Sequence, residues 1–321
     1  MKIVIPGGSG QVGTLLARSF HGKGHEVIVL SRALESAAWR VRVWDAESLG
    51  DWASELEGAH VVINLAGASV NCRYTPDNRR AILASRVNST RVLGEAIARA
   101  KDPPKVWLQA STATIYAHRY DAANDEATGI LGGSEPNAPD TWRFSIDVAS
   151  SWEKALDETV VPRTRKVKLR SAMVMGPDPG GIFDTLLRLV RFGLGGRAGD
   201  GRQYVSWIHQ KDFVSAIDWL IDQDDFAGAV NLAAPNPLPN AKFMKALRRA
   251  WGASIGLPAT AWMLEIGAIF LRTETELILK SRRVVPGRLL RKGFAFQFPT
   301  WPEAARDLCG RWRERNGRPR S

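Results

Sequence analysis

The chain has 321 residues, of which 45% are hydrophobic, so it is long enough to bury a large core in one large domain or two unequal ones. Its net charge is +11, but the basic residues are mostly scattered and form no zinc-finger or RNP-type motif, so we do not expect a nucleic-acid-binding protein. The two cysteines, Cys72 and Cys309, form no metal-ligand pattern, which favours a reduced, cytoplasmic protein without a bound metal.

A glycine-rich turn lies between the first two strand-like runs of the chain. The run at 2–6 is followed by a Gly-Gly-Ser-Gly-Gln-Val-Gly turn, a helical segment over 11–23 and a second run at 26–30. Such a turn lets backbone N–H groups approach a pyrophosphate at the helix N-terminus. Because the motif follows a strand and opens a βαβ-sized unit, it predicts a dinucleotide site. The residues expected at this cofactor are Gly7, Gly10, Gln11, Val12 and Gly13.

The end of the second run indicates which dinucleotide binds. An NAD site usually places Asp or Glu there to accept a hydrogen bond from the ribose 2′-hydroxyl, whereas this chain has Ser31 and Arg32. A guanidinium offers a charged, bidentate donor to a 2′-phosphate. The sequence therefore favours NADP(H) over NAD(H). Two other interpretations stay open: Arg32 is a solvated loop residue, or Glu35 takes the ribose.

Strand-like runs alternate with helical segments through the first half of the chain. The runs are 2–6, 26–30, 41–44, 60–65, 105–110 and 166–169, and the helices between them are 11–23, 46–56, 77–100 and 142–158. This alternation predicts an α/β fold of the Rossmann type, a doubly wound parallel sheet with helices on both faces. In such folds the ligand lies at the carboxyl ends of the strands.

The segments after the third and fourth runs are candidates for cofactor contacts. Asp45 could accept a hydrogen bond from the adenine amino group, or it could cap the helix expected from Ala46. The segment Leu65, Ala66 and Gly67 ends in two small residues, which would let the backbone pass close to the cofactor ribose, although a plain tight turn also explains them.

A hydroxyl-rich turn follows the fifth run, where substrate chemistry would occur. It contains Ser111, Thr112 and Tyr116. In the helix before that run, Arg86 lies within the apolar stripe, and an unpaired buried charge is costly. A cofactor phosphate or a carboxylate from elsewhere in the chain would each resolve that cost.

The second half of the chain has a different character. A Gly- and Pro-rich region at 176–201 contains a short helix, and a strand at 229–232 is followed mostly by helices. We therefore divide the chain into a Rossmann domain over 1–175, with 204–235 packing back on it, and a smaller, mostly helical substrate domain over 176–321. The apolar stretch 255–271 is interrupted and too short to span a bilayer, so we expect no membrane partner. The basic tail from Arg311 is expected to fray.

These motifs together resemble the extended short-chain dehydrogenase/reductase superfamily and, more narrowly, its "epimerase family" subgroup of NAD(P)-dependent epimerase/dehydratase-like proteins. The resemblance covers nearly the whole chain. It includes GGSGQVG at 7–13, NLAG at 64–67 and LRSAMVMG at 169–176. Its most specific parts are SWIH at 206–209 and RVVPGRLLRKGFAFQFPT at 283–300, which resembles a C-terminal module of that subgroup.

The resemblance implies roles for individual residues. Those implied at the cofactor are Gly7, Gly10, Gly13, Ser31, Arg32, Leu65, Ala66 and Arg86, with Val174 at the nicotinamide end. The chain departs from the subgroup at two positions: Tyr74 stands where Trp is usual, and Ala117 stands where Gly is usual.

The chain lacks the usual catalytic pair. Active superfamily members use Tyr-x-x-x-Lys with a Ser or Thr, so that the phenolate takes a proton while hydride moves to nicotinamide. Counting back from Glu153, these two positions fall near Ser145 and Ala149. His209 is a candidate acid/base, although a histidine before a helix is more often a capping or packing residue. The full set of acid/base candidates is Ser111, Thr112, Tyr116, Asp147 and His209.

Three functions stay open from the sequence. The first is an NADP(H)-binding, epimerase/dehydratase-like oxidoreductase with atypical catalytic residues, acting on a small polar substrate, of which a sugar-like molecule is one option. The second is a sensor or scaffold that binds NADP(H) without turnover. The third is a structural partner with a vestigial site. An oligomer is compatible with each of them.

Overall fold

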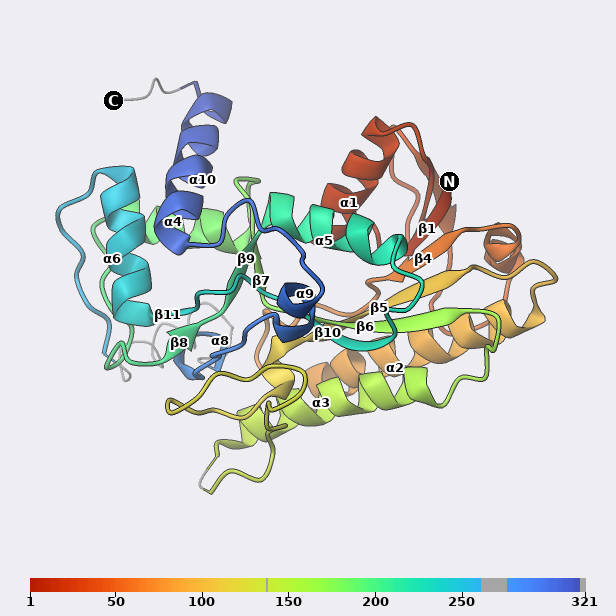
Figure 1. The fold of residues 1–321 in the computed structure, drawn as a ribbon, viewed down its shortest axis with the longest axis horizontal. Coiled ribbons are helices and arrows are strands. Elements are labelled where there is room, and N and C mark those ends of the chain that lie inside the picture. Colours follow the sequence, from red (N-terminus) through yellow and green to blue (C-terminus); the bar gives the residue numbers. More distant parts are fainter. Residues whose placement is uncertain (137, 261–275, 318–321) are drawn as a thin grey trace.

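The computed structural model describes residues 1–136, 138–260 and 276–317 (Figure 1). Its main feature is a seven-stranded parallel sheet in the order β10-β6-β5-β4-β1-β2-β3. The order reverses between β1 and β4, and ligands of doubly wound sheets bind at such a reversal. The predicted Rossmann-type fold class is confirmed. The strands are β1 Lys2–Pro6, β2 Glu26–Ser31, β3 Arg40–Val43, β4 Val61–Asn64, β5 Val106–Thr112, β6 Arg165–Ser171 and β10 Gly228–Leu232.

Both faces of the sheet are buried. Ile3 and Ile5 belong to the core on one face, while Val4 between them belongs to the core on the other. This two-sided burial explains why β1, β2 and β4 are nearly continuous apolar runs in the sequence, whereas the edge strand β3 is partly exposed and alternates arginine with valine. The covering helices are α1 Gln11–Gly22 and α5 Gln210–Ile221 on one face, and α2 Pro76–Arg99 and α3 Asp140–Asp157 on the other (Figure 1).

A further core lies at one end of the sheet, where three later helices gather (Figure 1). Its centre is the stacked pair of Phe243 and Trp301, whose ring centroids are 4.0 Å apart. The helices are α4 Ile182–Arg191, α6 Asn240–Trp251 and α10 Trp301–Arg315. Two small sheets adjoin them: β7 Met173–Met175 with β9 Trp207–His209, and β8 Tyr204–Val205 with β11 Leu238–Pro239.

The last part of the described chain returns to the Rossmann sheet. Leu289, from α9 Gly287–Arg291, and Phe294 join the same core as α1 and α5. The segment before α9 contains α8 Glu276–Leu279 and lies against the turn after β5. That turn contains the 3-10 helix η2 Ala113–Ile115.

Two local predictions are wrong. The helix expected over 46–56 is a bend followed by the 3-10 helix η1 Asp51–Leu56. Ala46 has a φ of 65°, in the left-handed region, so a right-handed helix cannot begin there. The tail expected to fray from Arg311 is helical to Arg315, because Trp312 is buried in the further core and the Arg313 guanidinium lies 4.3 Å from the centre of the Trp251 ring.

Candidate functional site

A cavity of about 290 Å³ opens at the carboxyl ends of β1, β2, β3 and β4. It therefore lies at the reversal of the strand order, where the fold is expected to bind its ligand. Many of the residues that the sequence predicted at the cofactor line it together. They are Gly7, Gly10, Ser31, Arg32, Asp45, Leu65, Ala66 and Gly67.

Two of the glycines are required by the fold and a third is not. Gly7 has a φ of 74°, and a Cβ there would lie 2.6 Å from the backbone nitrogen of Ala66. A Cβ on Gly13 would lie 2.4 Å from the Cα of Gly8. A Cβ on Gly10 would meet no protein atom nearer than 3.6 Å. Gly7 and Gly13 thus allow close backbone packing, whereas Gly10 leaves room in the cavity.

The N-terminus of α1 provides hydrogen-bond donors beside this cavity. Gly10 is the N-cap residue and has no side chain to accept from the first backbone N–H groups of the helix. These N–H groups have no partner inside a helix, and the helix dipole makes this end positive. The arrangement fits a pyrophosphate.

A guanidinium and a hydroxyl lie at the end of β2. The Ser31 Oγ donates a hydrogen bond to Ser9 Oγ at 3.2 Å and is almost fully buried. Arg32 is exposed, lines the cavity, and its side chain has no ion pair or hydrogen bond within the described part of the chain. A free guanidinium at this place fits the 2′-phosphate of NADP(H).

Asp45 caps a turn rather than a helix. Its carboxylate accepts hydrogen bonds from the Ser48 hydroxyl and from the backbone nitrogens of Ser48 and Glu47. These bonds, with the Ser48 hydroxyl first, lower the pKa of Asp45 to about 2. The structure supports a capping role, although for a different element than expected. An adenine contact stays a prediction, since Asp45 also lines the cavity.

The other residues predicted at the cofactor lie outside this cavity. Val12 packs against the core beneath α1, and Gln11 is exposed at the start of that helix. Val174 lies in β7, paired with Ile208 of β9. Arg86 lines a second cavity beside the first.

This second cavity has a volume of about 260 Å³ and is enclosed by α2, the end of β5, α3 and α8. The predicted residues Ser111 and Thr112 line it from β5. Ser145 and Ala149, the two positions reached by counting back from Glu153, both line it from α3. The end of β5 and the middle of α3 therefore line one cavity.

Arg86 lines the second cavity and contacts Gly67 and Ala68, which line the first. Its Nη1 donates to the carbonyl oxygens of Ala68 at 3.1 Å and Ile82 at 3.0 Å, and its guanidinium lies 5.1 Å from the centre of the Trp152 ring. Burial lowers the pKa of Arg86 to about 10. A Cβ on Gly67 would lie 3.0 Å from its Cζ. No carboxylate pairs with Arg86 in residues 1–136, 138–260 and 276–317, so an anion from a ligand stays the prediction for its partner.

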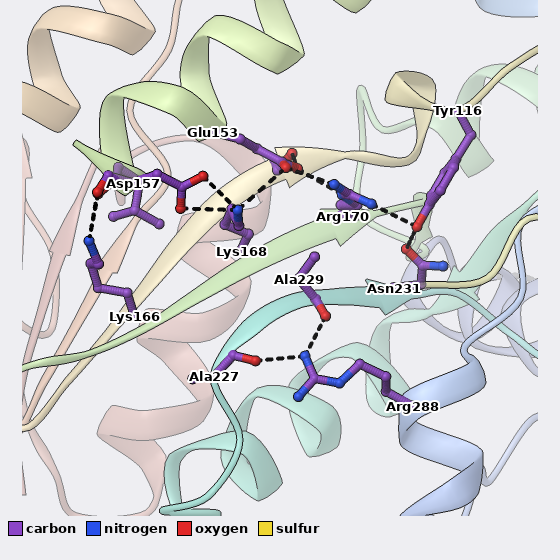
Figure 2. A network of polar contacts seen from close by, with 12 residues as sticks. Tyr116, Glu153, Asp157, Lys166, Lys168, Arg170, Ala227, Ala229, Asn231 and Arg288 are labelled. Atoms are coloured by element: carbon purple, nitrogen blue, oxygen red, sulfur yellow. Dashed lines mark hydrogen bonds and ion pairs between the residues drawn. The ribbon is translucent and has the colours of Figure 1, made fainter. Parts of the chain in front are cut away.

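Tyr116 belongs to a buried polar network behind the second cavity (Figure 2). Ser111 Oγ donates to Glu153 at 2.6 Å, and Arg170 donates to both Glu153 oxygens at 2.8 Å. Arg170 also donates to the Tyr116 hydroxyl, which donates to Asn231, both at 2.9 Å. Burial raises the pKa of Tyr116. Tyr116 is 2% exposed and does not line the cavity, so its position fits a structural role better than proton transfer.

His209 is fully buried at the start of α5. Its Nδ1 accepts a hydrogen bond from the Lys211 backbone nitrogen at 3.1 Å, and its Nε2 lies 3.1 Å from Asp307. Its ring packs 4.0 Å from that of Phe298, between centroids, and burial lowers its pKa. His209 lines neither cavity. This position fits the capping and packing interpretation. Asp147 is exposed on α3 and lines neither cavity either.

The described residues form neither a metal-binding cluster nor a membrane-spanning helix. They contain no group of three or more His, Cys, Asp or Glu side chains that could hold a metal ion. None of the helices they form is long and apolar enough to cross a bilayer.

Sequence reasoning missed three charged residues that the C-terminal segment brings to the turn after β5. Ser145 Oγ donates to Glu276 at 2.5 Å, and Arg282 lies 3.4 Å from the same carboxylate. Lys280 Nζ donates to the carbonyl oxygen of Thr114 at 2.8 Å. In the sequence these residues look like ordinary surface charges, and only the return of the chain to β5 buries them.

Lys280 provides a pH-dependent test of this packing. It is 1% exposed, and burial lowers its pKa to about 8 from 10.5. Between pH 8 and 10.5 the unfolded chain binds more protons than the folded one, so this residue's contribution to the free energy of unfolding rises with pH. Urea unfolding measures the free energy of unfolding of wild type and of Lys280→Met. From pH 7 to pH 10, the value for wild type should rise by about 2 kcal/mol relative to that of the variant. A difference that does not change with pH would contradict the burial of a charged Lys280.

Comparison with sequence families identifies two segments. The model of the NAD dependent epimerase/dehydratase family matches residues 3–139. The model of a domain of unknown function, DUF1731, matches residues 259–308. The second match agrees with the C-terminal module that the sequence resemblance implied.

Relatives extend over almost the whole chain. The mouse epimerase family protein SDR39U1 is 31% identical over 314 residues, covering 96% of this chain and 99% of the relative. The Bacillus subtilis epimerase family protein YfhF is 29% identical, with 93% and 94% covered. A crystal structure of human SDR39U1 with NADPH has a TM-score of 0.82 at 28% identity, with 96% and 99% covered. A nucleoside-diphosphate sugar epimerase from Corynebacterium glutamicum has a TM-score of 0.70 at 26% identity, with 99% and 62% covered.

Proposed function

The chain belongs to the NAD-dependent epimerase/dehydratase family, and on this basis we propose that it binds NADP(H) and transfers hydride to or from a small polar substrate. The observation that carries the proposal is the cavity at the strand reversal, with the N-terminus of α1 on one side and Arg32 on another, whose side chain has no partner among the described residues. The side of the cavity formed by the N-terminus of α1 fits a pyrophosphate, and the side formed by Arg32 fits a 2′-phosphate.

Within this proposal, the turn from Gly7 to Gly10 and the first N–H groups of α1 hold the pyrophosphate. Arg32 holds the 2′-phosphate, while Leu65, Ala66 and Gly67 lie along the ribose. The human relative crystallised with NADPH supports this choice of cofactor. NADP(H) supplies the hydride equivalent, so the protein must position a substrate carbon and move a proton.

The second cavity is the proposed substrate site. Its Arg86 contacts Ala68, which lines the first cavity. Ser111 and Thr112 offer hydroxyls to a polar ligand. Phe144 and Trp152 form an apolar wall that would exclude water. A small hydroxylated, sugar-like molecule fits this mixture of surfaces. The relative described as a nucleoside-diphosphate sugar epimerase supports that class of substrate.

Arg32→Ala should weaken the binding of NADPH much more than the binding of NADH. We expect the Kd for NADPH to rise about 10- to 100-fold, because a charge-assisted contact is worth about 1.5–3 kcal/mol. The Kd for NADH should change less than about threefold, since NADH has no 2′-phosphate. Isothermal titration calorimetry of the purified protein measures both constants.

Arg143→Ala is the matched control, because Arg143 is an exposed arginine on α3 that lines neither cavity. It should leave both constants unchanged. Equal losses of affinity for NADPH and NADH in Arg32→Ala would show that Arg32 does not bind the 2′-phosphate. No heat from wild type with either oxidised or reduced cofactor would overturn the proposed function as a whole.

Turnover distinguishes an enzyme from a sensor or scaffold. NADPH oxidation with a panel of quinones, aldehydes and ketones tests the hydride transfer directly. Tight NADPH binding without consumption on the whole panel would favour the non-catalytic function.

A further inference from the structure

We propose that Ser145 and Glu276 form the proton relay of the second cavity, with Ser145 touching the substrate hydroxyl and Glu276 exchanging the proton behind it. This inference rests on the hydride transfer proposed above. It also assigns a role to the C-terminal segment, because Glu276 lies inside the matched domain of unknown function. The segment would complete the site of the Rossmann domain.

The two side chains meet at the wall of the cavity. Ser145 lies in α3 and Glu276 begins α8, and both line the same space. Ser145 Oγ donates to Glu276 Oε2 at 2.5 Å, a short charge-assisted hydrogen bond. Glu276 is the only carboxylate among the described residues that line this cavity. A substrate hydroxyl in the cavity would therefore find Ser145 backed by a proton acceptor.

The Glu276 carboxylate is buried and lies beside a positively charged side chain. It is 1% exposed, and a buried charge needs partners. Arg282 lies 3.4 Å from its Oε1 and is oriented by a hydrogen bond of 3.1 Å from Nε to Thr114 Oγ1. Arg282 thus places a positive charge beside the carboxylate that accepts the hydrogen bond from Ser145.

Ser145 has a second neighbour, the Tyr74 phenol. A hydrogen bond joins the two side chains, and burial raises the pKa of Tyr74. The phenol therefore stays protonated near neutral pH, and it can orient the serine hydroxyl without replacing it as the group that moves the proton.

The relay solves the problem of the missing Tyr and Lys. A serine hydroxyl alone is a poor base, but a carboxylate that takes its proton in the same step removes the need to form a free alkoxide on serine. In oxidation, the substrate O–H proton passes to Ser145 Oγ as the serine proton passes to Glu276 Oε2. The substrate C–H bond breaks with its electron pair, which reduces NADP⁺ to NADPH, and the C=O bond forms. Reduction of a carbonyl reverses each movement.

The test compares Ser145→Ala, Ser145→Thr and Glu276→Gln in the full chain. The binding readout is NADPH calorimetry, in which all three should keep the wild-type Kd within about threefold, because neither residue lines the dinucleotide cavity. The spectroscopic readout is the downfield proton resonance of the short Ser145–Glu276 hydrogen bond, which should be present in wild type and absent from Ser145→Ala and Glu276→Gln.

The kinetic readout is NADPH oxidation with the carbonyl panel. Ser145→Ala and Glu276→Gln should each lose about 100-fold or more in kcat, as expected for removal of general acid–base catalysis. The double variant should be no slower than either one, because the two groups act as a unit. Ser145→Thr keeps the hydroxyl and should retain most of the rate. Ser150→Ala, an exposed serine on the same helix, and Glu303→Gln, an exposed glutamate on α10, should behave as wild type.

Each other outcome overturns the relay. Variants that turn over as fast as wild type would make the pair structural. A greater loss in Tyr74→Phe than in Ser145→Ala would give the proton transfer to the phenol. If the wild-type protein binds NADPH but reduces no carbonyl, both the proposed hydride transfer and the relay are wrong. If it binds no NADPH, the proposed function has already failed its calorimetric test.

Discussion

Glu153→Ala should lower the free energy of unfolding by about 3–5 kcal/mol, the effect of removing one partner of a buried ion pair. Arg170 donates two hydrogen bonds of 2.8 Å to this carboxylate, and both side chains are at most 10% exposed. Lys168 lies 3.9 Å from it (Figure 2), and the Ser111 hydroxyl donates a hydrogen bond to it. The substitution would leave a buried guanidinium without its counter-charge. Urea unfolding followed by circular dichroism measures the change.

Glu158→Ala is the control for this prediction. Glu158 follows the end of α3, and its contacts with Lys154 at 3.7 Å and Arg91 at 4.0 Å are exposed. Exposed pairs of this kind contribute about 0–1 kcal/mol. Similar losses at Glu153 and Glu158 would show that the buried network does not hold β5, β6 and α3 together. Since Ser111 would also lose its acceptor, we expect the second cavity to be disturbed in Glu153→Ala.

Gly13→Val should abolish NADPH binding, with a Kd raised more than about 100-fold, and should lower the free energy of unfolding by about 1–3 kcal/mol. The Cβ would lie 2.4 Å from Gly8 Cα, 2.6 Å from its carbonyl carbon and 2.6 Å from its carbonyl oxygen. All three atoms are backbone, so the turn itself must move. The turn presents the N–H groups proposed to bind the pyrophosphate, and calorimetry and urea unfolding report on the two effects separately.

Gly10→Ala provides the contrast. Its Cβ would approach no protein atom closer than 3.6 Å, and Gly10 has a φ of −71°, which alanine adopts without strain. The free energy of unfolding should therefore stay within about 0.5 kcal/mol of wild type. The methyl group would stand beside the N-terminus of α1, so NADPH binding should weaken about tenfold or more. Unchanged binding in Gly10→Ala would place the pyrophosphate elsewhere.

The sequence alone was enough for those features that depend on neighbours along the chain. Strand-like runs with helical segments between them predicted all the strands of the main sheet. The signal is strongest for β1, β2 and β4, because strands buried on both faces are apolar over most of their length. The glycine spacing after β1 predicted the turn, since only residues without a Cβ allow that backbone approach at Gly7 and Gly13. Arg32 could be assigned to the cofactor site because it directly follows a strand whose end can be recognised in the sequence.

Features that depend on distant segments were decided by the tertiary structure. Asp45 was equally compatible with a helix cap, and the left-handed φ of Ala46 made it the cap of a turn. Tyr116 was grouped with the hydroxyls after β5, but Arg170 and Asn231, 54 and 115 residues away, draw it into a buried network. Glu276 reaches Ser145 across 131 residues, and no local pattern encodes such a contact. Short-range periodicity thus determined the strands and the cofactor turn, whereas the burial and pairing of polar side chains followed from which distant segments the fold brings together.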